Sequence, residues 1–316
     1  MVKIKIFTLV FLLNFSVTIF SQSFELVPLG VHGGGEESNL SAYLLGEKGK
    51  HEYISLDAGT LLSGINKAIE AGIFSDSNEN VLKNYIKAYF ISHGHLDHLS
   101  GLIINSPLDS KKNIYGLPFT LDILKNRYFT NDAWSNFANE GDQPILGKYT
   151  YKRYSHGESF PIEGTQLTGT IYTLSHVSPY KSSALLVKNP QNDYVLYLGD
   201  TGADRIEKSN ALDTLWTTIA PLVKNQRLKA ILIETSFENG HSEDSLFGHL
   251  TPKLLNEELK ILAQKSGKNT LENLKIIITH LKPEGNNIPK IKEQLLADNP
   301  LKLQLIFPMQ GEVIEL

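Results

Sequence analysis

The chain has 316 residues, of which 41% are hydrophobic, and a formal net charge of −4. This length and composition allow one large hydrophobic core or two smaller ones and exclude a disordered or fibrous protein. The lack of cysteine excludes disulfide bonds, thiolate metal sites and lipid attachment at an N-terminal cysteine. The negative net charge and the absence of a long basic run in the sequence argue against binding of long nucleic acids. They still allow a small anionic ligand held by local cations.

Residues 1–22 are predicted to be a signal peptide, followed by a single domain over residues 23–316. Lys3 and Lys5 precede an apolar run over residues 6–20, and small or polar residues follow, which is the order of a secretory signal. The run is short for a bilayer span, and an uncleaved anchor is the alternative. Cleavage would remove two lysines and no acid, changing the net charge from −4 to −6. The product would be a soluble periplasmic or secreted protein without stable membrane insertion.

The first predicted strands are residues 24–30, 41–45 and 53–56. Three glycines, Gly33 to Gly35, lie between the first two strands, where they either turn the chain or let the backbone approach a ligand. Their neighbour His32 is a lone histidine, and we do not predict it to be a metal ligand. Asp57 ends the third strand, and a helix is predicted over residues 61–71.

The next strand, residues 87–91, leads into four potential metal ligands within six residues: His93, His95, Asp97 and His98. His93 and His95 alternate, so both imidazoles can point to one side of an extended segment. Asp97 and His98 lie beyond the bend and can face a second ion. The alternative is that these are solvated side chains with Asp97 as the N-cap of the following helix.

The remaining chain is predicted to alternate strands with helices, which indicates an α/β protein with sheets covered by helices. The predicted strands are residues 114–116, 166–174, 184–187, 194–198, 230–237, 274–280, 301–307 and 313–316. The predicted helices are residues 118–128, 253–264 and 288–297, the second with Thr251 as N-cap and Pro252 at its first position.

Polar residues follow several of these strands. His176 follows the strand at 166–174, Asp200 follows a buried strand and a glycine, and His280 ends the strand at 274–280. A carboxylate placed like Asp200 is suited to bridge two cations, with a helix cap or a loop salt bridge as the alternative. Imidazole and carboxylate donors without thiolate suit zinc, and also manganese or iron.

The spacing His-x-His-x-Asp-His resembles the metal signature of the metallo-β-lactamase fold. The longer run from His93 to Pro107 resembles the signature of class II cyclic-nucleotide phosphodiesterases, without a departure over fifteen positions. The resemblance covers nearly all of the chain after residue 22 and is sparse between residues 110 and 164. It implies an αβ/βα sandwich of two mixed sheets covered by helices, with the site along one edge of both sheets.

The resemblance also implies a ligand set for two divalent metal ions. One ion would be held by His93, His95 and His176, the other by Asp97, His98 and His280, with Asp200 bridging them. An aspartate at the position of Asp57 commonly supports the metal loop in this fold. The competing role for Asp57, or for Thr60, is the N-cap of the helix that follows.

The implied reaction is hydrolysis of a 3′,5′-cyclic nucleotide, cAMP or cGMP, to the 5′-monophosphate by a hydroxide that bridges the two ions. Alternatives are another hydrolase of this fold, acting on a lactone, a sulfate ester or another phosphodiester, and a binding module that has lost turnover. The sequence leaves the oligomeric state open, a homodimer included. Trp134 and Phe137 either stack on a nucleobase or seal a loop against the core.

Asp97, Glu234 and His249 are the predicted catalytic residues, with His249 also in contact with the substrate. Glu234 and the segment around His249 resemble the glutamate and histidine motifs of tRNA 3′-processing endonucleases. A hydrogen bond from His249 to Glu234 would keep the imidazole protonated for donation to the departing oxygen. Alternatively, His249 only binds the phosphate or caps the helix. Three further histidines are expected to be ordinary surface residues: His51, His156 and His241.

Overall fold

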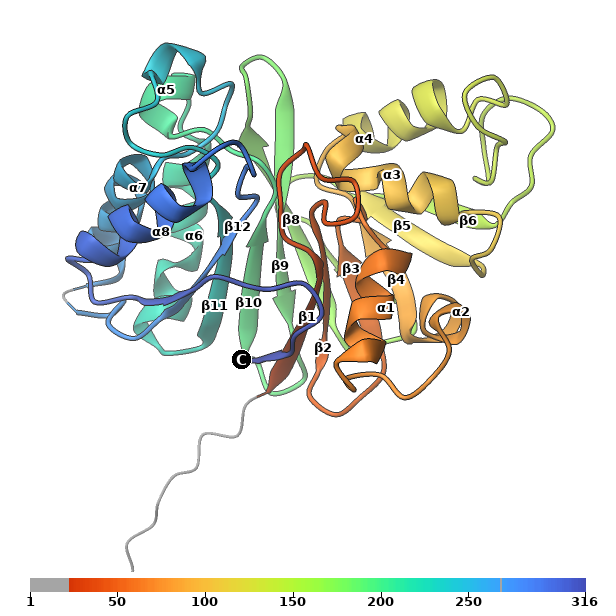
Figure 1. The fold of residues 1–316 in the computed structure, drawn as a ribbon, viewed down its shortest axis with the longest axis horizontal. Coiled ribbons are helices and arrows are strands. Elements are labelled where there is room, and N and C mark those ends of the chain that lie inside the picture. The colour runs from red at the N-terminus through yellow and green to blue at the C-terminus, as the bar shows by residue number, and fades with distance from the viewer. Residues whose placement is uncertain (1–22, 268) are drawn as a thin grey trace, which may run out of the picture.

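The computed structural model describes residues 23–267 and 269–316. Two seven-stranded sheets form its centre, and helices cover their outer faces on the left and right of Figure 1. This arrangement confirms the predicted α/β sandwich of two mixed sheets covered by helices. The proposed signal peptide at residues 1–22 lies outside the described residues. Among those described, no helix combines the length and apolar character that crossing a bilayer requires.

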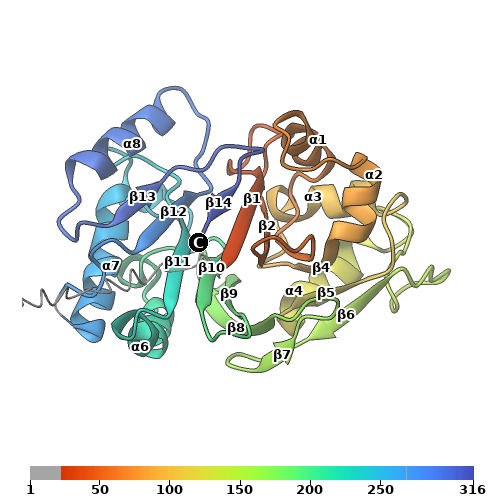
Figure 2. The same ribbon diagram turned by 90° about the horizontal axis from the view of Figure 1, so that it is seen from below.

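The first sheet has the strand order β14-β1-β2-β3-β4-β5-β6. Its strands are β1 (Phe24–Gly30), β2 (Ala42–Glu47), β3 (Tyr53–Leu56), β4 (Ile86–Phe90), β5 (Lys112–Gly116), β6 (Tyr149–Arg153) and β14 (Ile314–Glu315). Pairing is antiparallel from β14 to β3 and parallel from β3 to β6. Figure 2 shows the C-terminal β14 beside β1, so the last strand completes the sheet that the first strand begins.

The second sheet repeats this plan in the order β13-β12-β11-β10-β9-β8-β7. Its strands are β7 (Ser159–Pro161), β8 (Thr168–Ser175), β9 (Lys181–Lys188), β10 (Tyr194–Leu198), β11 (Leu228–Glu234), β12 (Lys275–Thr279) and β13 (Gln304–Ile306). Pairing is antiparallel from β7 to β10 and parallel from β10 to β13. Parallel neighbours need crossover connections, and helices supply most of them.

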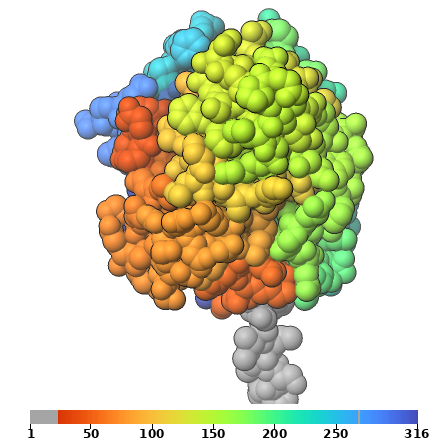
Figure 3. Space-filling view, turned by 90° about the vertical axis from the view of Figure 1, so that its right-hand side faces the viewer, coloured from red at the N-terminus to blue at the C-terminus, as the bar shows by residue number. Residues whose placement is uncertain are grey.

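Helices from each half of the chain cover the sheet of that half. The first layer holds α1 (Leu62–Glu70), α2 (Asn78–Asn80), the π-helical turn η1 (Val81–Tyr85), α3 (Leu96–Asn105), α4 (Pro118–Ile123) and the π-helical turn η2 (Leu124–Tyr128). The second holds α5 (Asp204–Glu207), α6 (Ala211–Lys224), the 3₁₀ turn η3 (Glu243–Ser245), α7 (Pro252–Ser266) and α8 (Asn287–Ala297). The segments from α1 to β6, orange to yellow-green, make up most of the face in Figure 3.

Alternation along the strands builds three apolar layers. In β4, Ala88 and Phe90 face the core between the two sheets, whereas Tyr89 faces the helices of the first layer. In β10, Val195 and Tyr197 face the same central core, and their neighbours pack under α6 and α7. Because both faces of these strands are buried, only their ends are free to carry polar chemistry.

Four elements differ from the sequence prediction: α6, β6, β7 and η2. Helix α6 was not predicted, because threonines and Pro221 obscure its helical pattern, although its buried residues recur at helical spacing from Leu212 to Val223. Strands β6 and β7 were missed for lack of a clear alternation. The helix predicted over residues 118–128 continues as the π-helical turn η2, which ends at Tyr128. The predicted cap is confirmed, since Thr251 Oγ1 accepts a hydrogen bond from Leu254 N at 3.3 Å.

Candidate metal centre

The loop that joins β4 to α3, residues 91–95, is here called the histidine loop. It leaves the sheet after Phe90, and His95 occupies the N-cap position of α3 with an extended backbone and no side-chain cap. Asp97 lies inside the first turn of the helix, so the alternative in which Asp97 is the N-cap is wrong. His93 and His98 are fully buried, whereas His95 is exposed. A buried strand thus delivers two imidazoles into the interior.

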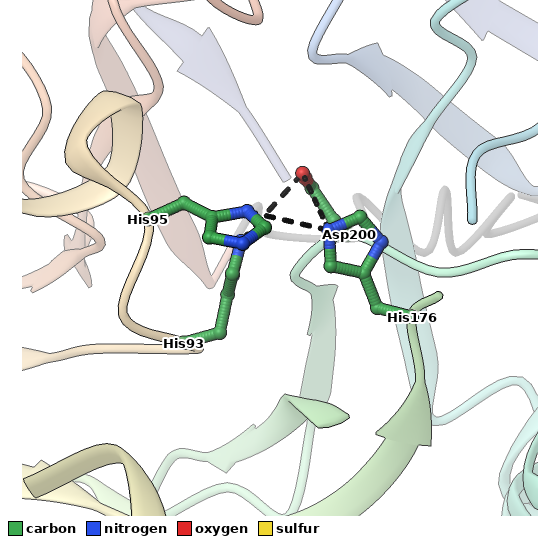
Figure 4. Close-up of side chains that lie close together, drawn as sticks. All are labelled: His93, His95, His176 and Asp200. Carbon is green, nitrogen blue, oxygen red and sulfur yellow. Dashed lines mark hydrogen bonds and ion pairs between the residues drawn. The ribbon is translucent and has the colours of Figure 1, made fainter. Parts of the chain in front are cut away.

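One group of side chains gathers around Asp200, which follows β10. Figure 4 shows His93 and His95 of the histidine loop pointing toward His176, at the end of β8, and toward Asp200. The Oδ2 atom of Asp200 lies 3.7 Å from His93 Nε2 and 3.8 Å from His176 Nε2. His95 Nδ1 lies 3.4 Å from His176 Nε2. One donor atom from each of these four residues falls within 4.8 Å of the others, so the group could hold a metal ion.

A second group shares the same aspartate. His280 Nε2 lies 3.2 Å from Asp97 Oδ2 and 3.2 Å from Asp200 Oδ2. His98 Nε2 lies 3.2 Å from Asp200 Oδ1 and 3.9 Å from Asp97 Oδ2. The structure therefore brings together all seven residues predicted as metal ligands, in two groups that meet at Asp200.

Asp57 fixes the orientation of the histidine loop and of His98. Its Oδ2 accepts hydrogen bonds from His98 Nδ1 (2.7 Å), Ser92 Oγ (2.7 Å) and Tyr197 OH (2.5 Å), and its Oδ1 accepts from Ser92 N (2.7 Å). The alternative role as an N-cap is wrong for both Asp57 and Thr60, because Leu61 occupies that position in α1 without a side-chain cap. Asp57 instead presents the lone pair of His98 Nε2 to the centre.

The rings of His93 and His176 are oriented in the same way, by a hydrogen bond at Nδ1. Because the hydroxyl of Ser92 donates to Asp57, it accepts from His93 Nδ1 at 3.0 Å. His176 Nδ1 donates to the carbonyl of Gly248 at 2.9 Å. In each ring the Nδ1 atom carries the proton, so the lone pair on Nε2 points inward.

His280 is held by the same device. Ser236 Oγ donates to Glu234 Oε2 at 2.6 Å, so its lone pair accepts from His280 Nδ1 at 2.9 Å. On the other side of the ring lies Gly33, where a Cβ would fall 2.2 Å from the imidazole. Gly33 N also donates to Leu281 O at 3.1 Å. Gly33 therefore does more than turn the chain, because its lack of a side chain lets the backbone pack against the ring of His280.

Divalent cations fit this arrangement. The Nε2 atoms of His93 and His98 are buried and have no hydrogen-bond partner within the described part of the chain. Four carboxylates are buried or half-buried around them, and in residues 23–267 and 269–316 their ion pairs are with histidines and never with lysine or arginine: Asp57, Asp97, Asp200 and Glu234. Converging lone pairs and uncompensated buried carboxylates are costly unless cations lie between them.

The pKa shifts follow from the same charges. Burial and the neighbouring imidazoles lower the pKa of His93, and burial together with His176 lowers the pKa of His95 to about 4. Burial opposes ionisation of Asp97, but the imidazoles of His98 and His280 outweigh it and lower the pKa of that carboxyl. These shifts favour neutral His93 and His95 and ionised Asp97, the protonation states that a metal ion requires of its ligands.

His249 lies beside this centre and is bound to Glu234. Its Nδ1 donates to Glu234 Oε1 at 2.8 Å, and Glu234 also accepts from Thr201 N at 2.9 Å. Burial disfavours the imidazolium, but the Glu234 carboxylate outweighs burial and raises the pKa of His249. His249 Nδ1 also lies 3.8 Å from Asp200 Oδ2, and with His280 these residues form a third group that could hold an ion. The hydrogen bond to Glu234 fixes the orientation of the His249 ring beside the centre.

Two tyrosines that the sequence analysis did not single out also hold the histidine loop. Tyr128 OH donates to Gly94 O at 2.9 Å, and Gly94 N donates to Tyr180 OH at 3.1 Å. The ring of Tyr180 stacks on His95, with centroids 5.0 Å apart and an interplanar angle of 3°. Tyr128 ends η2 and Tyr180 lies between β8 and β9, so nothing in the local sequence pattern marked either residue.

Several other residues that were considered from the sequence lie away from the centre. Trp134 and Phe137 pack against the apolar core of the first layer, and Trp134 Nε1 donates to Ser106 Oγ at 3.0 Å. They therefore seal a loop against the core, which is one of the two roles predicted for them, the other being stacking on a nucleobase. His51 and His156 are exposed and His241 is half-exposed, outside the two groups described above. His32 bonds to Glu36 at 2.7 Å.

Comparison with known proteins places the chain in a family. The model of the class-II cAMP phosphodiesterases matches residues 24–306. The chain belongs to this family. Among its relatives, the 3′,5′-cyclic-nucleotide phosphodiesterase of Aliivibrio fischeri is 41% identical over 95% of each chain. The 3′,5′-cyclic-nucleotide phosphodiesterase of Schizosaccharomyces pombe is 32% identical over 88% of each chain.

Solved structures confirm the fold of this class-II family member. Unliganded yeast PDE1 superposes with a TM-score of 0.83 at 22% identity, covering 93% of this chain and 99% of that one. The metallo-β-lactamase fold protein YhfI of Bacillus subtilis superposes with a TM-score of 0.60 at 14% identity, again covering 93% and 99%. The predicted metallo-β-lactamase-type sandwich and the predicted class-II phosphodiesterase family are both confirmed.

Proposed function

We propose that the chain hydrolyses 3′,5′-cyclic nucleotides, cAMP or cGMP, to 5′-monophosphates at the centre built on Asp200. Membership of the class-II family supports the substrate class, and relatives named 3′,5′-cyclic-nucleotide phosphodiesterase support it further. The observation that carries the catalytic part is the inward orientation of four imidazole lone pairs beside uncompensated carboxylates. Such a centre serves hydrolysis, because it can hold cations against the negative charge of a phosphodiester.

The ligand roles in this proposal are those assigned from the sequence. His93, His95 and His176 would hold one ion, Asp97, His98 and His280 the other, and Asp200 would contact both. Two divalent ions, when bound, supply Lewis-acid polarisation of the phosphodiester and water activation at neutral pH. The donor set of imidazoles and carboxylates favours zinc, with manganese and iron as the alternatives.

His249 would supply the proton that the departing ribose 3′-oxygen takes up. In the hydrolysis, water adds to phosphorus, the bond from phosphorus to the ribose 3′-oxygen breaks, and that oxygen takes up a proton. Glu234 holds Nδ1 of His249 at 2.8 Å and raises its pKa, so the ring keeps a second proton on Nε2. An imidazolium at this position acts as a general acid toward the departing oxygen.

A leaving-group comparison tests the role of His249. The His249→Ala variant should slow hydrolysis of a cyclic nucleotide by about 100-fold or more, because general acid catalysis contributes about 10²–10⁴-fold. It should slow a p-nitrophenyl phosphodiester much less, since p-nitrophenolate departs without a proton. Equal losses on both substrates would leave His249 as a phosphate ligand only.

The proposed activity is tested on the purified protein with a panel of substrates. We expect hydrolysis of 3′,5′-cyclic AMP or GMP, 5′-monophosphate as product, and no turnover of lactones or sulfate esters. Asp97→Ala should lose at least about a hundredfold in kcat/KM with its fold retained, since even supporting residues of metal sites contribute 10- to 100-fold. Elemental analysis of the same sample identifies the ions. Turnover of a lactone or a sulfate ester in place of cyclic nucleotides would replace the proposed reaction with another of the same fold.

We also propose that the protein is exported, with residues 1–22 as a cleaved signal. The support is the sequence order of two lysines, an apolar run and small or polar residues. N-terminal sequencing of the protein recovered from the periplasm or medium should begin near residue 23. Recovery of the full-length chain in the cytoplasmic or membrane fraction would contradict export of a soluble product.

A further inference from the structure

Three exposed apolar side chains lie close in the chain to residues of the candidate centre. Among the residues that the structure describes, Leu96, Val177 and Phe247 are 59%, 42% and 64% exposed. Each lies within two positions of a residue of the centre: Leu96 follows His95, Val177 follows His176, and Phe247 precedes His249 by two. Val177 and Phe247 also share one hollow, and apolar side chains grouped at one place on a surface mark a site that binds an apolar group.

Two of these residues are held in an unfavourable backbone conformation. Val177 and Phe247 both have φ of +51°, a region that β-branched and bulky side chains avoid. The hydrogen bond from His176 Nδ1 to Gly248 O, 2.9 Å long, ties the two segments together. Gly248 also lies so close to the neighbouring backbone that a Cβ there would fall 2.3 Å from Val177 N. Strain that the surroundings impose in this way is typical of ligand-binding sites.

Val177, Phe247 and Gly248 line one hollow of about 450 Å³. A volume of this size is within the usual range for a small-molecule site. The hollow also carries three carboxylates, Glu207, Glu243 and Asp244, and one lysine, Lys208; Arg205 pairs with Glu243 at 2.8 Å, which leaves one negative charge in excess. Its negative balance disfavours the phosphate end of a nucleotide and accepts an uncharged end.

We propose that Phe247, with Val177 beside it, is the stacking platform for the nucleobase of the substrate. The inference rests on the proposed function, in which the phosphate lies at the metal centre. Two residues span at most about 7 Å, so Phe247 lies within reach of a base whose ribose and phosphate extend toward His249. Trp134 and Phe137, the aromatic residues that the sequence suggested for this role, pack against the core, and the ring of Tyr180 is stacked on His95. Phe247 thus sets affinity for the base and plays no part in breaking the phosphodiester.

The test compares two phosphate ligands on the metal-loaded protein by calorimetric titration. AMP carries a base and ribose 5-phosphate does not, so we expect the wild type to bind AMP about 5- to 150-fold more tightly, the range that base stacking supplies. Phe247→Ala should reduce that ratio to near one. Phe247→Gly should do the same while relieving the backbone strain, and Phe247→Trp should keep the ratio. Leu296→Ala is the matched control, because Leu296 is 66% exposed on α8 and should leave the ratio unchanged.

The outcomes separate this inference from the proposed function. A wild type that does not prefer AMP over ribose 5-phosphate, or a Phe247→Ala variant that keeps the preference, overturns the platform even where cyclic nucleotides are hydrolysed. A wild type that prefers AMP through Phe247 but hydrolyses no cyclic nucleotide overturns the proposed reaction and leaves the platform standing. Circular dichroism of each variant confirms that the exposed substitutions keep the fold.

Discussion

Two buried carboxylates of the first layer, Asp57 and Asp109, have similar surroundings and different electrostatic balance. Asp109 Oδ2 accepts from Tyr89 OH at 2.7 Å and Tyr149 OH at 2.8 Å, and its Oδ1 pairs with the buried ammonium of Lys112. The cluster around Asp109 is therefore complete in charge and in hydrogen bonds. Buried ion pairs of this kind, once both partners are present, need nothing further.

Asp57 also accepts from a tyrosine, Tyr197, and from a serine. Among the residues that the structure describes, its one ion-pair partner is His98, which faces two further carboxylates, Asp97 and Asp200. Burial disfavours the imidazolium, but the three carboxylates outweigh it and raise the pKa of His98. The comparison teaches that a buried carboxylate is structural where the chain itself balances the charge, and functional where the balance must come from a bound cation.

Removal of metal should have the largest effect. We expect exhaustive chelation to abolish hydrolysis and to lower the midpoint of thermal unfolding, because the carboxylates and imidazoles around Asp200 then lack their counter-charge. Activity assays and calorimetry before and after chelation measure both effects. Re-addition of divalent cations should restore both quantities. Activity that survives chelation would break the comparison, since the centre at Asp200 would then be as self-sufficient as the cluster at Asp109.

The next largest effect should be a loss of stability at the Asp109 cluster. Lys112→Met leaves the carboxylate of Asp109 buried without its cation and should cost about 3–5 kcal/mol in the free energy of unfolding, measured with denaturant. Lys111→Met, at the exposed neighbour, should cost little. The double variant Asp109→Asn, Lys112→Met should recover most of the loss, because the asparagine oxygen still accepts from both tyrosines. A fall in kcat/KM per folded molecule would show that this cluster is not purely structural.

Asp57→Asn should act on the centre, in contrast to Asp109→Asn. We expect a 10- to 100-fold loss in metal affinity or activity, because the amide no longer fixes the Nδ1 proton of His98 by charge. Competition with a chelator of known affinity measures the metal constant. Tyr197→Phe, which removes one of the donors to Asp57, should have a smaller effect in the same direction. If Asp57→Asn binds metal as tightly as the wild type, the support assigned to Asp57 is wrong.

The smallest effect on activity at the pH optimum is expected for Glu234→Gln. The direction in which this variant shifts the pH–rate profile tests whether His249 is the acid. The raised pKa of His249 keeps the imidazolium present to higher pH, and activity falls as pH rises through that pKa. The glutamine removes the charge that raises the pKa, so the alkaline limb of the pH–rate profile should move to lower pH by roughly 1–3 units. The same profile measured on a p-nitrophenyl ester serves as the control, because its limb should stay in place. A shift to higher pH would exclude His249 as the acid.

Much of the fold and the composition of the centre could be predicted because their signals are local. Four donors crowd into residues 93–98, and His176, Asp200 and His280 each follow a strand that reads clearly as apolar. Parallel strands in a covered sheet bring such ends to one edge. Their assignment to particular ions remains a prediction.

Apart from Asp57, whose supporting role the family resemblance implied, the partners that orient the donors could not be predicted, because they join positions far apart in the chain. Asp57 and Tyr197 are 140 residues apart, and His176 and Gly248 are 72 residues apart. Ser236 was visible only as a neighbour of Glu234, although it lies between that carboxylate and His280. Phe247 carried no sequence pattern at all, since its exposure and its backbone angle emerge only in three dimensions.

The packing of Gly33 on the ring of His280 joins an early part of the chain to a late one. The glycine is made early and the histidine some 247 residues later, and each completes the environment of the other. A ribosome that stalls before the β12 strand releases a fragment in which the second ion has lost one of its three proposed terminal donors. A fragment that ends before His280 therefore lacks one of the seven proposed ligands.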